Sequence, residues 1–343
     1  MGKGGRKKRK KASRSRKLAA KLGAAVLALA VLWGFAAEWY VHHPRAWLAE
    51  KSSEWTVLAT APLLWFGNPL ADITDGLGWT GHDAVYEYDT EAPSGEVTFA
   101  GAPKRTGTPA PDDIRVIDRG EFKIGWSPSL RHPVWCAYHV TADKQFEDGK
   151  RPSFLVDNEV GRAPRPADYT NSGYDRGHMV PNHAIISRFG EAARRKTFLM
   201  GNIAPQSPQL NRGVWRDVEH RIADLWTARY GEIWVVVGCI PSSDGEKLSG
   251  TDIDVPRSFY QIIIAQEGLD VRALAVVFPQ NVPWSAWAAR NIATIDEIES
   301  MTGLDFNPDL PEFIQTPLEA DLPSRLWPVR TRDIFRQIML RFM

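Results

Sequence analysis

The residues best suited to chemistry lie in two short blocks that together hold a histidine, arginines, an amide and a carboxylate. The first block, 174–178, reads Tyr-Asp-Arg-Gly-His, and the second runs from 201 to 219. Hydrolysis of a phosphodiester needs a deprotonated water as the nucleophile and positive charge around the transition state. Histidine suits the first task near neutral pH, and an arginine or a metal ion suits the second. The two blocks therefore predict metal-assisted cleavage of phosphodiesters.

Four residues of the first block suit that reaction. His178 would be the base, and it follows Gly177, where the backbone can turn tightly and let a phosphate approach. Arg176 can donate two hydrogen bonds to phosphate oxygens. Asp175 carries a negative charge that can hold an arginine or a backbone turn in place. The competing interpretation is a surface turn with an ion pair.

The second block offers two oxygen ligands, Asn211 and Glu219. We expect residues 211–219 to begin a helix, with Asn211 near its N-terminus. Eight residues of continuous helix separate two side chains by roughly 12 Å of rise and about 80° of rotation. One of them would then bind an ion directly while the other holds its waters, an arrangement that suits Mg²⁺. The alternative is that Asn211 caps the helix and Glu219 is a solvated helix residue.

Together the blocks resemble the DNA/RNA non-specific endonucleases of the ββα-metal class. The main matching segments are 172–182, 198–206 and 210–215, followed by Glu219, in the same order and with similar gaps. Shorter matches lie at 133–138, 234–238, 295–299 and 302–306. The resemblance covers residues 113–311.

The resemblance implies a role for each matching position. His178 is the expected general base, Asn211 the one direct protein ligand of the catalytic metal, and Glu219 the carboxylate that orients metal-bound water. Arg176 is expected to contact the phosphate, and Asn202 to brace the site. The implied metal is Mg²⁺, or Mn²⁺ in its place.

The chain departs from the family pattern at the arginine that precedes an aromatic-x-x-Asp group. In this chain the group is 154–157, and both Lys150 and Arg151 stand before it. We assign Arg151 to the transition-state charge, with Lys150 as the alternative.

A second departure concerns the contact to the leaving group. Many members have an arginine one helical turn after the glutamate, and this chain has Ala223 there. Arg216 and Arg221 are the two candidates to replace it.

The fold class predicted for the nuclease region is α+β, with a central, mostly antiparallel sheet, helices and a ββα finger that carries the site. Runs of β-branched and aromatic residues predict buried strands, and Leu269 falls in a predicted hairpin turn. The strands are 134–140, 233–237, 259–265 and 273–278. Short helices are expected over 284–293 and 295–302, and 188–199 is expected to be either a helix or a loop. Cys136 and Cys239 each fall in a strand, where they are either small core residues or a disulfide.

Composition and charge divide the 343 residues into unlike parts. Hydrophobic residues make up 43% of the chain, enough for a sizeable core, and the net charge is +1. Residues 1–21 contain 11 of the 42 basic residues and no acidic ones, which leaves 31 basic against 41 acidic residues in the remainder. An acidic body argues against tight, processive binding of a polyanion, but not against phosphodiester chemistry.

The predicted organisation has five parts, of which the first two form a membrane anchor. A basic tail, 1–17, precedes an apolar segment, 18–40, which as a helix of roughly 34 Å can span a bilayer. Basic residues on the N-terminal side predict that this end stays in the cytoplasm and that the body is exported to the periplasmic or extracellular side. The alternative is a cleaved signal peptide. The other parts are a juxtamembrane region and linker, 41–112, the nuclease domain, 113–311, and an extension, 312–343, with a basic amphipathic helix from Arg325 onwards.

The sequence thus predicts a metal-dependent, largely sequence-independent endonuclease. Its expected partners are DNA and/or RNA as substrate, the membrane through the N-terminal helix, and a second copy of the chain in a possible homodimer. Two alternatives keep the same fold. One is an inactive nucleic-acid-binding or scaffold protein, and the other is a phosphodiesterase acting on small diesters, which the acidic body favours.

Overall fold

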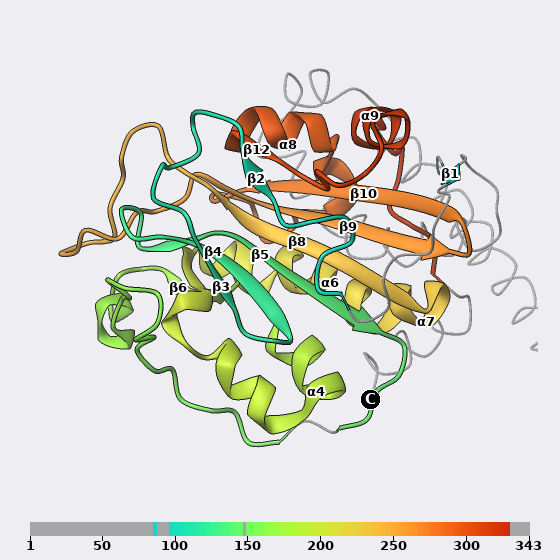
Figure 1. Cartoon of the computed structure of the whole chain (residues 1–343). Helices are drawn as coiled ribbons and strands as arrows, with labels where there is room; N and C mark the ends of the chain where they lie inside the picture. Colours follow the sequence, from blue (N-terminus) through green and yellow to red (C-terminus); the bar gives the residue numbers. More distant parts are fainter. Residues whose placement is uncertain (1–84, 88–95, 147–148, 330–343) are drawn as a thin grey trace, which may run out of the picture.

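A large antiparallel sheet organises the chain (Figure 1), whose computed structural model describes residues 85–87, 96–146 and 149–329. The strand order is β1-β10-β9-β8-β5-β4-β3, and β11 pairs with β10. The strands are β1 Tyr86–Glu87, β3 Arg115–Asp118, β4 Phe122–Ser127, β5 His132–Thr141, β8 Glu232–Ile240, β9 Ser258–Glu267, β10 Asp270–Pro279 and β11 Ile292–Ala293. Two small sheets pair β2 Lys104–Arg105 with β12 Leu304–Asp305, and β6 Asp175–His178 with β7 Ile203–Gln206.

The central strands are buried on both faces, which explains their almost unbroken apolar sequence. Successive side chains of a strand point to opposite faces. In β8, Ile233 and Val235 therefore belong to one core cluster, whereas Trp234 and Val236 belong to the other. Both clusters continue into β5 and β9. Strands of a sheet that is covered on both faces have continuous hydrophobic sequences instead of alternating hydrophobic and polar residues.

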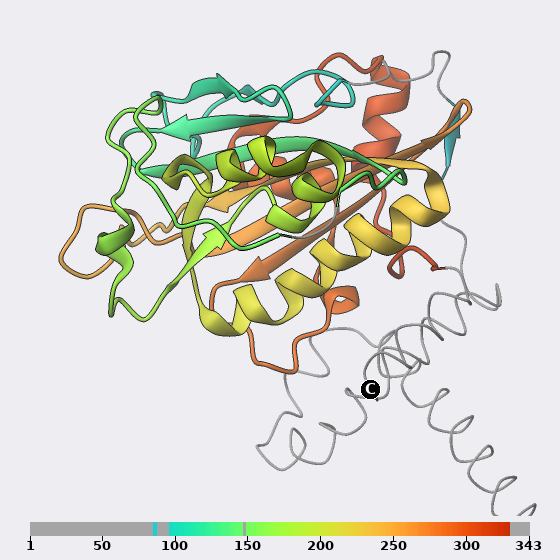
Figure 2. The same cartoon turned by 90° about the horizontal axis from the view of Figure 1, so that it is seen from below.

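Helices cover each face of the sheet (Figures 1 and 2). One face packs against α4 Asn182–Thr197, α5 Pro208–Arg212, α6 Val214–His220, the π-helical turn η3 Arg221–Trp226 and α7 Thr227–Tyr230. The other packs against α8 Ile295–Thr302 and α9 Glu312–Ala320. Three short 3₁₀ turns, η1 Pro166–Tyr169, η2 Met200–Asn202 and η4 Ala288–Asn291, complete the described elements.

The predicted α+β architecture is confirmed, and most predicted elements are present. The four predicted strands are β5, β8, β9 and β10, and Leu269 lies in the turn between the last two. The helix expected over 188–199 begins earlier, at Asn182, and Gly190 interrupts it with φ 79° and ψ −169°. The helix 295–302 is α8, with Thr294 and Glu297 as a capping box. The helix expected over 284–293 is wrong, because only η4 and the short β11 form there.

The continuous helix expected over 211–219 is also wrong. It breaks at Gly213, whose φ of −103° and ψ of −119° are not helical, so that α5 and α6 meet at an angle. An added Cβ at Gly213 would lie 2.3 Å from the Gln209 carbonyl oxygen, which explains why glycine stands there. The N-cap of α5 is Ser207, not Asn211, because the Ser207 hydroxyl accepts from the Leu210 amide. Asn211 lies in the last turn of α5, and the eight-residue helical spacing to Glu219 does not apply.

The body extends beyond the nuclease limits expected from sequence. Val97 and Phe99 are buried in the core, and β2 pairs with β12, so part of the expected linker is packed structure. At the other end, α9 covers the sheet, and Trp327 packs against Trp226 and Tyr230. Residues 325–329, the described start of the expected amphipathic helix, are not helical. The expected tail 1–17, the anchor 18–40 and residues 330–343 lie outside the described residues.

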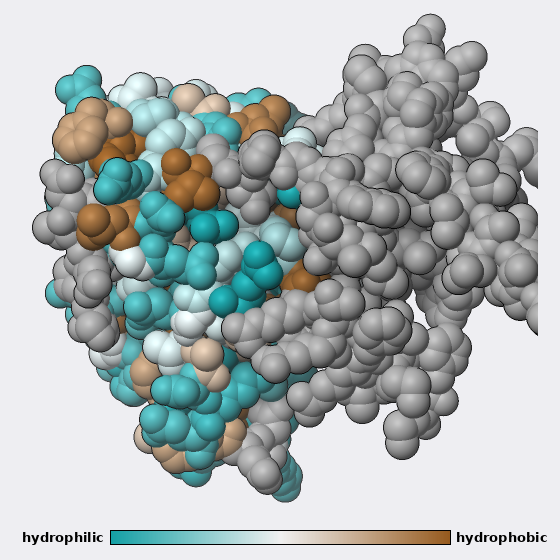
Figure 3. Space-filling view, turned by 90° about the vertical axis from the view of Figure 1, so that its right-hand side faces the viewer, coloured by the Kyte–Doolittle hydropathy of each residue, from teal (hydrophilic) through white to brown (hydrophobic). Residues whose placement is uncertain are grey.

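Within the part of the chain that the structure describes, no helix combines the length and apolar character needed to cross a membrane. On the face drawn in Figure 3, hydrophilic residues predominate and apolar residues gather only in small separate groups.

The two cysteines serve as core residues. Cys136 in β5 and Cys239 in β8 are both free and buried. The Cys136 thiol lies 3.8 Å from the Asn202 side-chain oxygen, and the Cys239 thiol lies 3.8 Å from the Met179 sulfur. The structure therefore contains the small-residue alternative and not the disulfide.

Candidate active site

Strands β6 and β7, followed by α5 and α6, hold the residues of the two sequence blocks. The antiparallel register places Asp175 opposite Gln206 and His178 opposite Ile203. A Cβ at Gly177 would lie 2.3 Å from the Gln206 side-chain oxygen, so only glycine lets that buried side chain cross the strand. Arg176 and His178 share one face of β6 because side chains alternate along a strand.

Asn202 fixes the segment that follows His178. Its side chain is fully buried, accepts from the Val180 amide at 2.9 Å, and donates to the Val180 carbonyl at 2.9 Å and the Thr197 carbonyl at 3.0 Å. These bonds connect the end of α4 to the chain just after β6. The geometry is that of a brace, as the sequence suggested for this residue.

His178 lies between two phenyl rings. Its ring centroid is 5.3 Å from that of Phe154 and 4.8 Å from that of Phe198. Burial and the positive charge of Arg151 lower the pKa of His178 to about 3. The imidazole is therefore neutral at neutral pH and can accept a proton. Its Nε2 atom is buried and has no hydrogen-bond partner among the described residues.

Two guanidinium groups flank the same rings. The Arg151 Cζ atom lies 5.8 Å from the Phe154 centroid and 5.3 Å from that of Phe198, and the Arg176 Cζ atom lies 5.6 Å from that of Phe154. Arg176 is held by the Pro166 carbonyl, to which its Nε and Nη2 donate at 3.0 and 2.6 Å. Arg151, Arg176 and His178 thus gather around one aromatic side chain.

A buried ion pair anchors the loop that carries Arg151 and Phe154. Arg119 Nη2 lies 2.5 Å from Asp157 Oδ2, and both side chains are almost wholly buried. The second candidate for this loop, Lys150, contributes its main-chain carbonyl to Arg194 Nη1 at 3.2 Å. Of the two basic residues, Arg151 is the one whose side chain lies over the rings beside His178.

Asp175 connects β6 to α5. Its carboxylate accepts from Asn211 Nδ2 at 2.8 Å and from Arg212 Nε and Nη2 at 2.7 and 2.5 Å. Burial acts to raise the pKa of Asp175, but the hydrogen bonds from Arg212 and Asn211 and the charges of Arg212 and Arg151 lower it overall. Asn211 is therefore attached to the strand that ends in His178.

Glu219 lies on α6 in a half-buried position. Burial raises the pKa of its carboxyl to about 8, although the Trp215 hydrogen bond and the charges of Arg216 and His183 act against the rise. Trp215 Nε1 donates to Glu219 Oε1 at 3.0 Å and so fixes the carboxyl on the helix. In the free protein the carboxyl is mostly protonated at neutral pH, and a cation placed beside it would favour ionisation.

The two arginines proposed to replace the missing family arginine occupy different environments. Arg216 is exposed one turn before Glu219, and its positive charge acts to lower the pKa of the Glu219 carboxyl. Arg221 is buried and its Nε lies 3.2 Å from Asp217 Oδ2. Ala223 is itself buried, and its carbonyl accepts from Arg188 Nη2 at 2.5 Å. Arg216 is the candidate with access to substrate.

The donor set fits a hard divalent cation. Because the amide nitrogen of Asn211 donates a hydrogen bond to Asp175, the amide oxygen points away from that carboxylate and can bind a metal. Glu219 is a half-buried carboxyl whose pKa is raised by burial, against the lowering effect of the Trp215 hydrogen bond and of the Arg216 and His183 charges. Amide and carboxyl oxygens are the ligand types that Mg²⁺ takes in proteins, and the ion usually keeps several of its waters.

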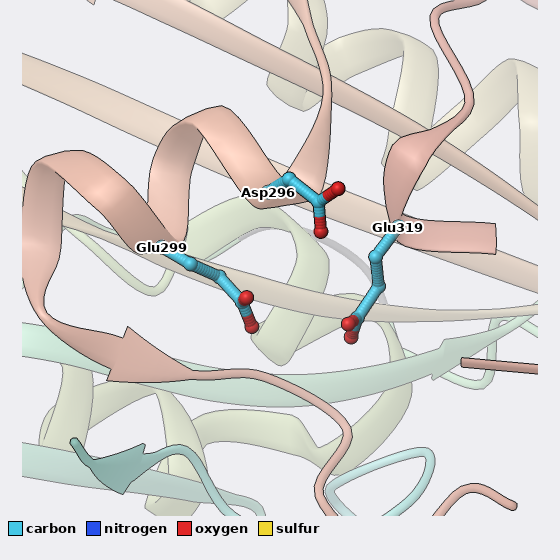
Figure 4. Close-up of side chains that lie close together, drawn as sticks. All are labelled: Asp296, Glu299 and Glu319. Atoms are coloured by element: carbon cyan, nitrogen blue, oxygen red, sulfur yellow. The ribbon is translucent and has the colours of Figure 1, made fainter. Parts of the chain in front are cut away.

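A separate group of carboxyls lies on the opposite side of the sheet, where Asp296 and Glu299 of α8 face Glu319 of α9 (Figure 4). One oxygen from each lies within 4.8 Å of the others. Burial, together with the other carboxyls, raises the pKa of Glu299 to about 7 and that of Glu319 to about 8. The Phe306 amide donates to Glu299 at 2.8 Å, and Asn307 and Gln315 donate to Glu319 at 3.4 Å. Protonation at neutral pH and amide donors account for the close approach of Glu299 and Glu319.

Sequence reasoning missed three contributors to the site. Phe154 and Phe198 form the walls around His178, and Arg212 pairs with Asp175 through both carboxylate oxygens. Phe154 belonged to a recognised motif, but only the fold shows what its ring contacts. The opposite charges of Arg212 and Asp175 were visible, yet 37 residues separate them in the chain.

Comparison with known proteins identifies the family. The model of the DNA/RNA non-specific endonuclease family matches residues 101–313, and the chain therefore belongs to that family. Its members are nucleases, which makes the protein an enzyme of the hydrolase class.

Individual relatives give the extent of the similarity. A nuclease of Serratia marcescens is 31% identical over 216 residues, which cover 60% of this chain and 79% of that protein. A nuclease of Nostoc sp. is 28% identical over 232 residues, which cover 62% and 80%. The mitochondrial nuclease EXOG of Xenopus laevis is 30% identical over 205 residues, but the chain spans only 56% of its length.

A solved structure shares the fold. The crystal structure of the EndoG/EndoGI complex, which concerns the mechanism of EndoG inhibition, aligns with a TM-score of 0.53. The match has 23% sequence identity and covers 62% of this chain and 92% of that one.

Proposed function

We propose that the protein is a Mg²⁺-dependent endonuclease that hydrolyses DNA and/or RNA largely without regard to sequence, with His178 as the general base. Family membership supports the general activity, and the site geometry supports the residue roles. The observation that carries the proposal is the neutral His178 with its unpartnered Nε2, flanked by Arg151 and Arg176.

The chain's own residues divide the work as follows. His178 takes a proton from the attacking water, and its pKa rises as the anionic phosphate approaches. Arg151 and Arg176 neutralise charge on the phosphate, and Arg216 contacts the leaving side. These are contacts to the phosphate backbone, which carries no sequence information, so cleavage is largely independent of sequence.

The proposed metal site rests on Asn211 and Glu219. Asn211 would hold Mg²⁺, or Mn²⁺ in its place, through its amide oxygen, and the bound ion would supply positive charge for the leaving oxygen. Glu219, fixed by Trp215, would accept hydrogen bonds from waters of the ion.

Digestion of plasmid DNA and of RNA tests the proposal. The full-length chain in mild detergent, with Mg²⁺ or with EDTA, is compared with His178→Ala and with Arg195→Ala, an exposed arginine on α4 that pairs with Glu191. We expect metal-dependent cutting that His178→Ala lowers by about 10²- to 10⁴-fold, the usual contribution of a general base, while Arg195→Ala cuts normally. Cutting that survives in His178→Ala, with unchanged thermal melting, would reject the assigned base. A wild type without activity would reject the proposal.

The same proposal extends to location. The apolar segment 18–40 after a basic tail supports a membrane anchor with the nuclease body on the periplasmic or extracellular side.

A further inference from the structure

We propose that Asp175 and Arg212 act together as a positioning pair that sets the amide of Asn211 with its oxygen free for the metal. This inference rests on the proposed function, because it takes Asn211 as the metal ligand. It adds Arg212, a residue with no role so far, and gives Asp175 a defined one.

The contacts place Asp175 at the centre of the group. One oxygen, Oδ2, accepts from Asn211 Nδ2 at 2.8 Å and from Arg212 Nε at 2.7 Å. The other, Oδ1, accepts from Arg212 Nη2 at 2.5 Å. The Asp175 side chain is 17% exposed, whereas that of Arg212 is 61% exposed. The carboxylate of Asp175 is therefore largely buried, and the guanidinium of Arg212 binds it from the solvent side.

The orientation of the amide follows from the chemistry of the carboxylate. A carboxylate that pairs with a guanidinium through both oxygens is ionised and can only accept hydrogen bonds. The Asn211 atom facing it must then be the NH₂ group, and the amide oxygen must face the other way. Without this partner the amide could rotate by 180° and present NH₂, which cannot bind a cation.

Arg212 contributes by holding the carboxylate. The planar guanidinium occupies both oxygens of Asp175 in a fixed geometry, which restrains the side chain that in turn restrains Asn211. A lysine would supply a similar charge but only a point contact, and a glutamine would supply neither. The expected order of effect on the metal site is therefore Arg212→Gln greater than Arg212→Lys.

Calorimetric titration with MnCl₂, without nucleic acid, tests the pair independently of activity. The full-length chain in mild detergent is compared with Asp175→Ala, Arg212→Gln and Arg212→Lys. We expect Asp175→Ala to weaken Mn²⁺ binding by about 10- to 100-fold, the range for residues that orient metal ligands. Arg212→Gln should weaken binding in the same direction by less, and Arg212→Lys by less again.

Two further variants separate the possible failures. Asp217→Ala is the matched control, because it removes the same charge from α6. The Asp217 carboxylate pairs with Arg221 and not with a proposed metal ligand. This variant should therefore bind Mn²⁺ within about twofold of the wild type. Asn211→Ala should abolish binding. If Asn211→Ala does so but Asp175→Ala binds like the wild type, the positioning pair is wrong and the proposed function stands. If Asn211→Ala binds like the wild type, the metal assignment itself is wrong.

Two measurements complete the design. Asp175→Asn keeps an acceptor oxygen and should fall between wild type and Asp175→Ala, which preserves the test if the alanine variant melts at a lower temperature. An Arg212→Gln variant with unchanged Mn²⁺ affinity but a raised KM for DNA would show that Arg212 contacts substrate and not the metal site, and would overturn its part of the inference.

Discussion

His178 works in surroundings that remove its charge before substrate arrives. Phe154 and Phe198 exclude water from the imidazole, and Arg151 adds a positive charge beside it. Both effects disfavour the protonated form. The proposed base is therefore neutral over a wide pH range, and the negative charge of an arriving phosphate would raise its pKa.

Replacing Arg151 should move the acid side of the pH profile. Removal of its positive charge makes protonation of His178 easier, so the pKa of His178 rises towards its ordinary value without reaching it, since burial remains. In Arg151→Gln, kcat/KM should then begin to fall at a higher pH than in the wild type. The measurement is the initial rate of plasmid nicking as a function of pH, with Arg195→Gln as the control. An unshifted profile with a uniformly lower rate would mean that Arg151 contacts phosphate but does not tune the base.

At the scale of elements, helices α8 and α9 face each other through the carboxyls of Asp296, Glu299 and Glu319. Glu319 has a pKa of about 8 in the folded protein against an ordinary 4.5, so the folded state binds a proton that the unfolded state releases between these values. Stability therefore falls as pH rises through this window. The loss is absent below the ordinary value, where both states are protonated.

Glu319→Gln should remove that pH dependence. The amide stays neutral at every pH and can still accept from Asn307 and Gln315. We expect its Tm to exceed that of the wild type at pH 8 and to match it near pH 4.5, the two ends of the window. Thermal melting of both proteins checks this, and Glu312→Gln, exposed in the first turn of α9, should show no such pH-dependent gain. An equal Tm difference at both pH values would contradict the account.

Elements could be predicted from the sequence where the signal was local. Strands β5, β8, β9 and β10 are long apolar runs, and α8 has a capping box at its start. The family could also be predicted, since the order and spacing of its motif blocks along the chain are characteristic.

Features that depend on tertiary contacts could not be predicted. A glycine at 213 is a poor helix former, but its non-helical φ and ψ, which end α5 and begin α6, appear only in the fold. The partners of Asp175 and of His178 lie on other elements, so their contacts and pKa values appear only in the fold.

At the scale of the whole molecule, the distribution of charge separates the two ends. The first 21 residues hold 11 basic and no acidic residues, whereas the remainder has 31 basic against 41 acidic. In the proposed topology, the positive charge before the apolar segment would keep that end in the cytoplasm, and the acidic body would not adhere strongly to nucleic acid.

The proposed anchor predicts how the full chain fractionates. Expressed in a bacterium, it should remain in the membrane fraction after an alkaline carbonate wash, because 18–40 can span the bilayer. Protease added to spheroplasts should digest the body. A Leu27→Arg, Val31→Arg double variant should lose membrane retention, since each central arginine costs about 3 kcal/mol on insertion scales. A shorter, soluble product from the wild type would instead indicate a cleaved signal peptide.

The sheet buried on both faces has a consequence for when the enzyme becomes active. Trp234 and Val236 are covered only when α8 and α9 pack over them. Strand β2 can pair only after β12, about 200 residues later in the chain, is present. Contacts between such distant segments form late in folding. A chain still being synthesised, or still passing through a membrane, therefore lacks a closed core even when its histidine block is already complete. Both faces of the sheet are therefore covered only once the segment that forms α8, β12 and α9 has been made.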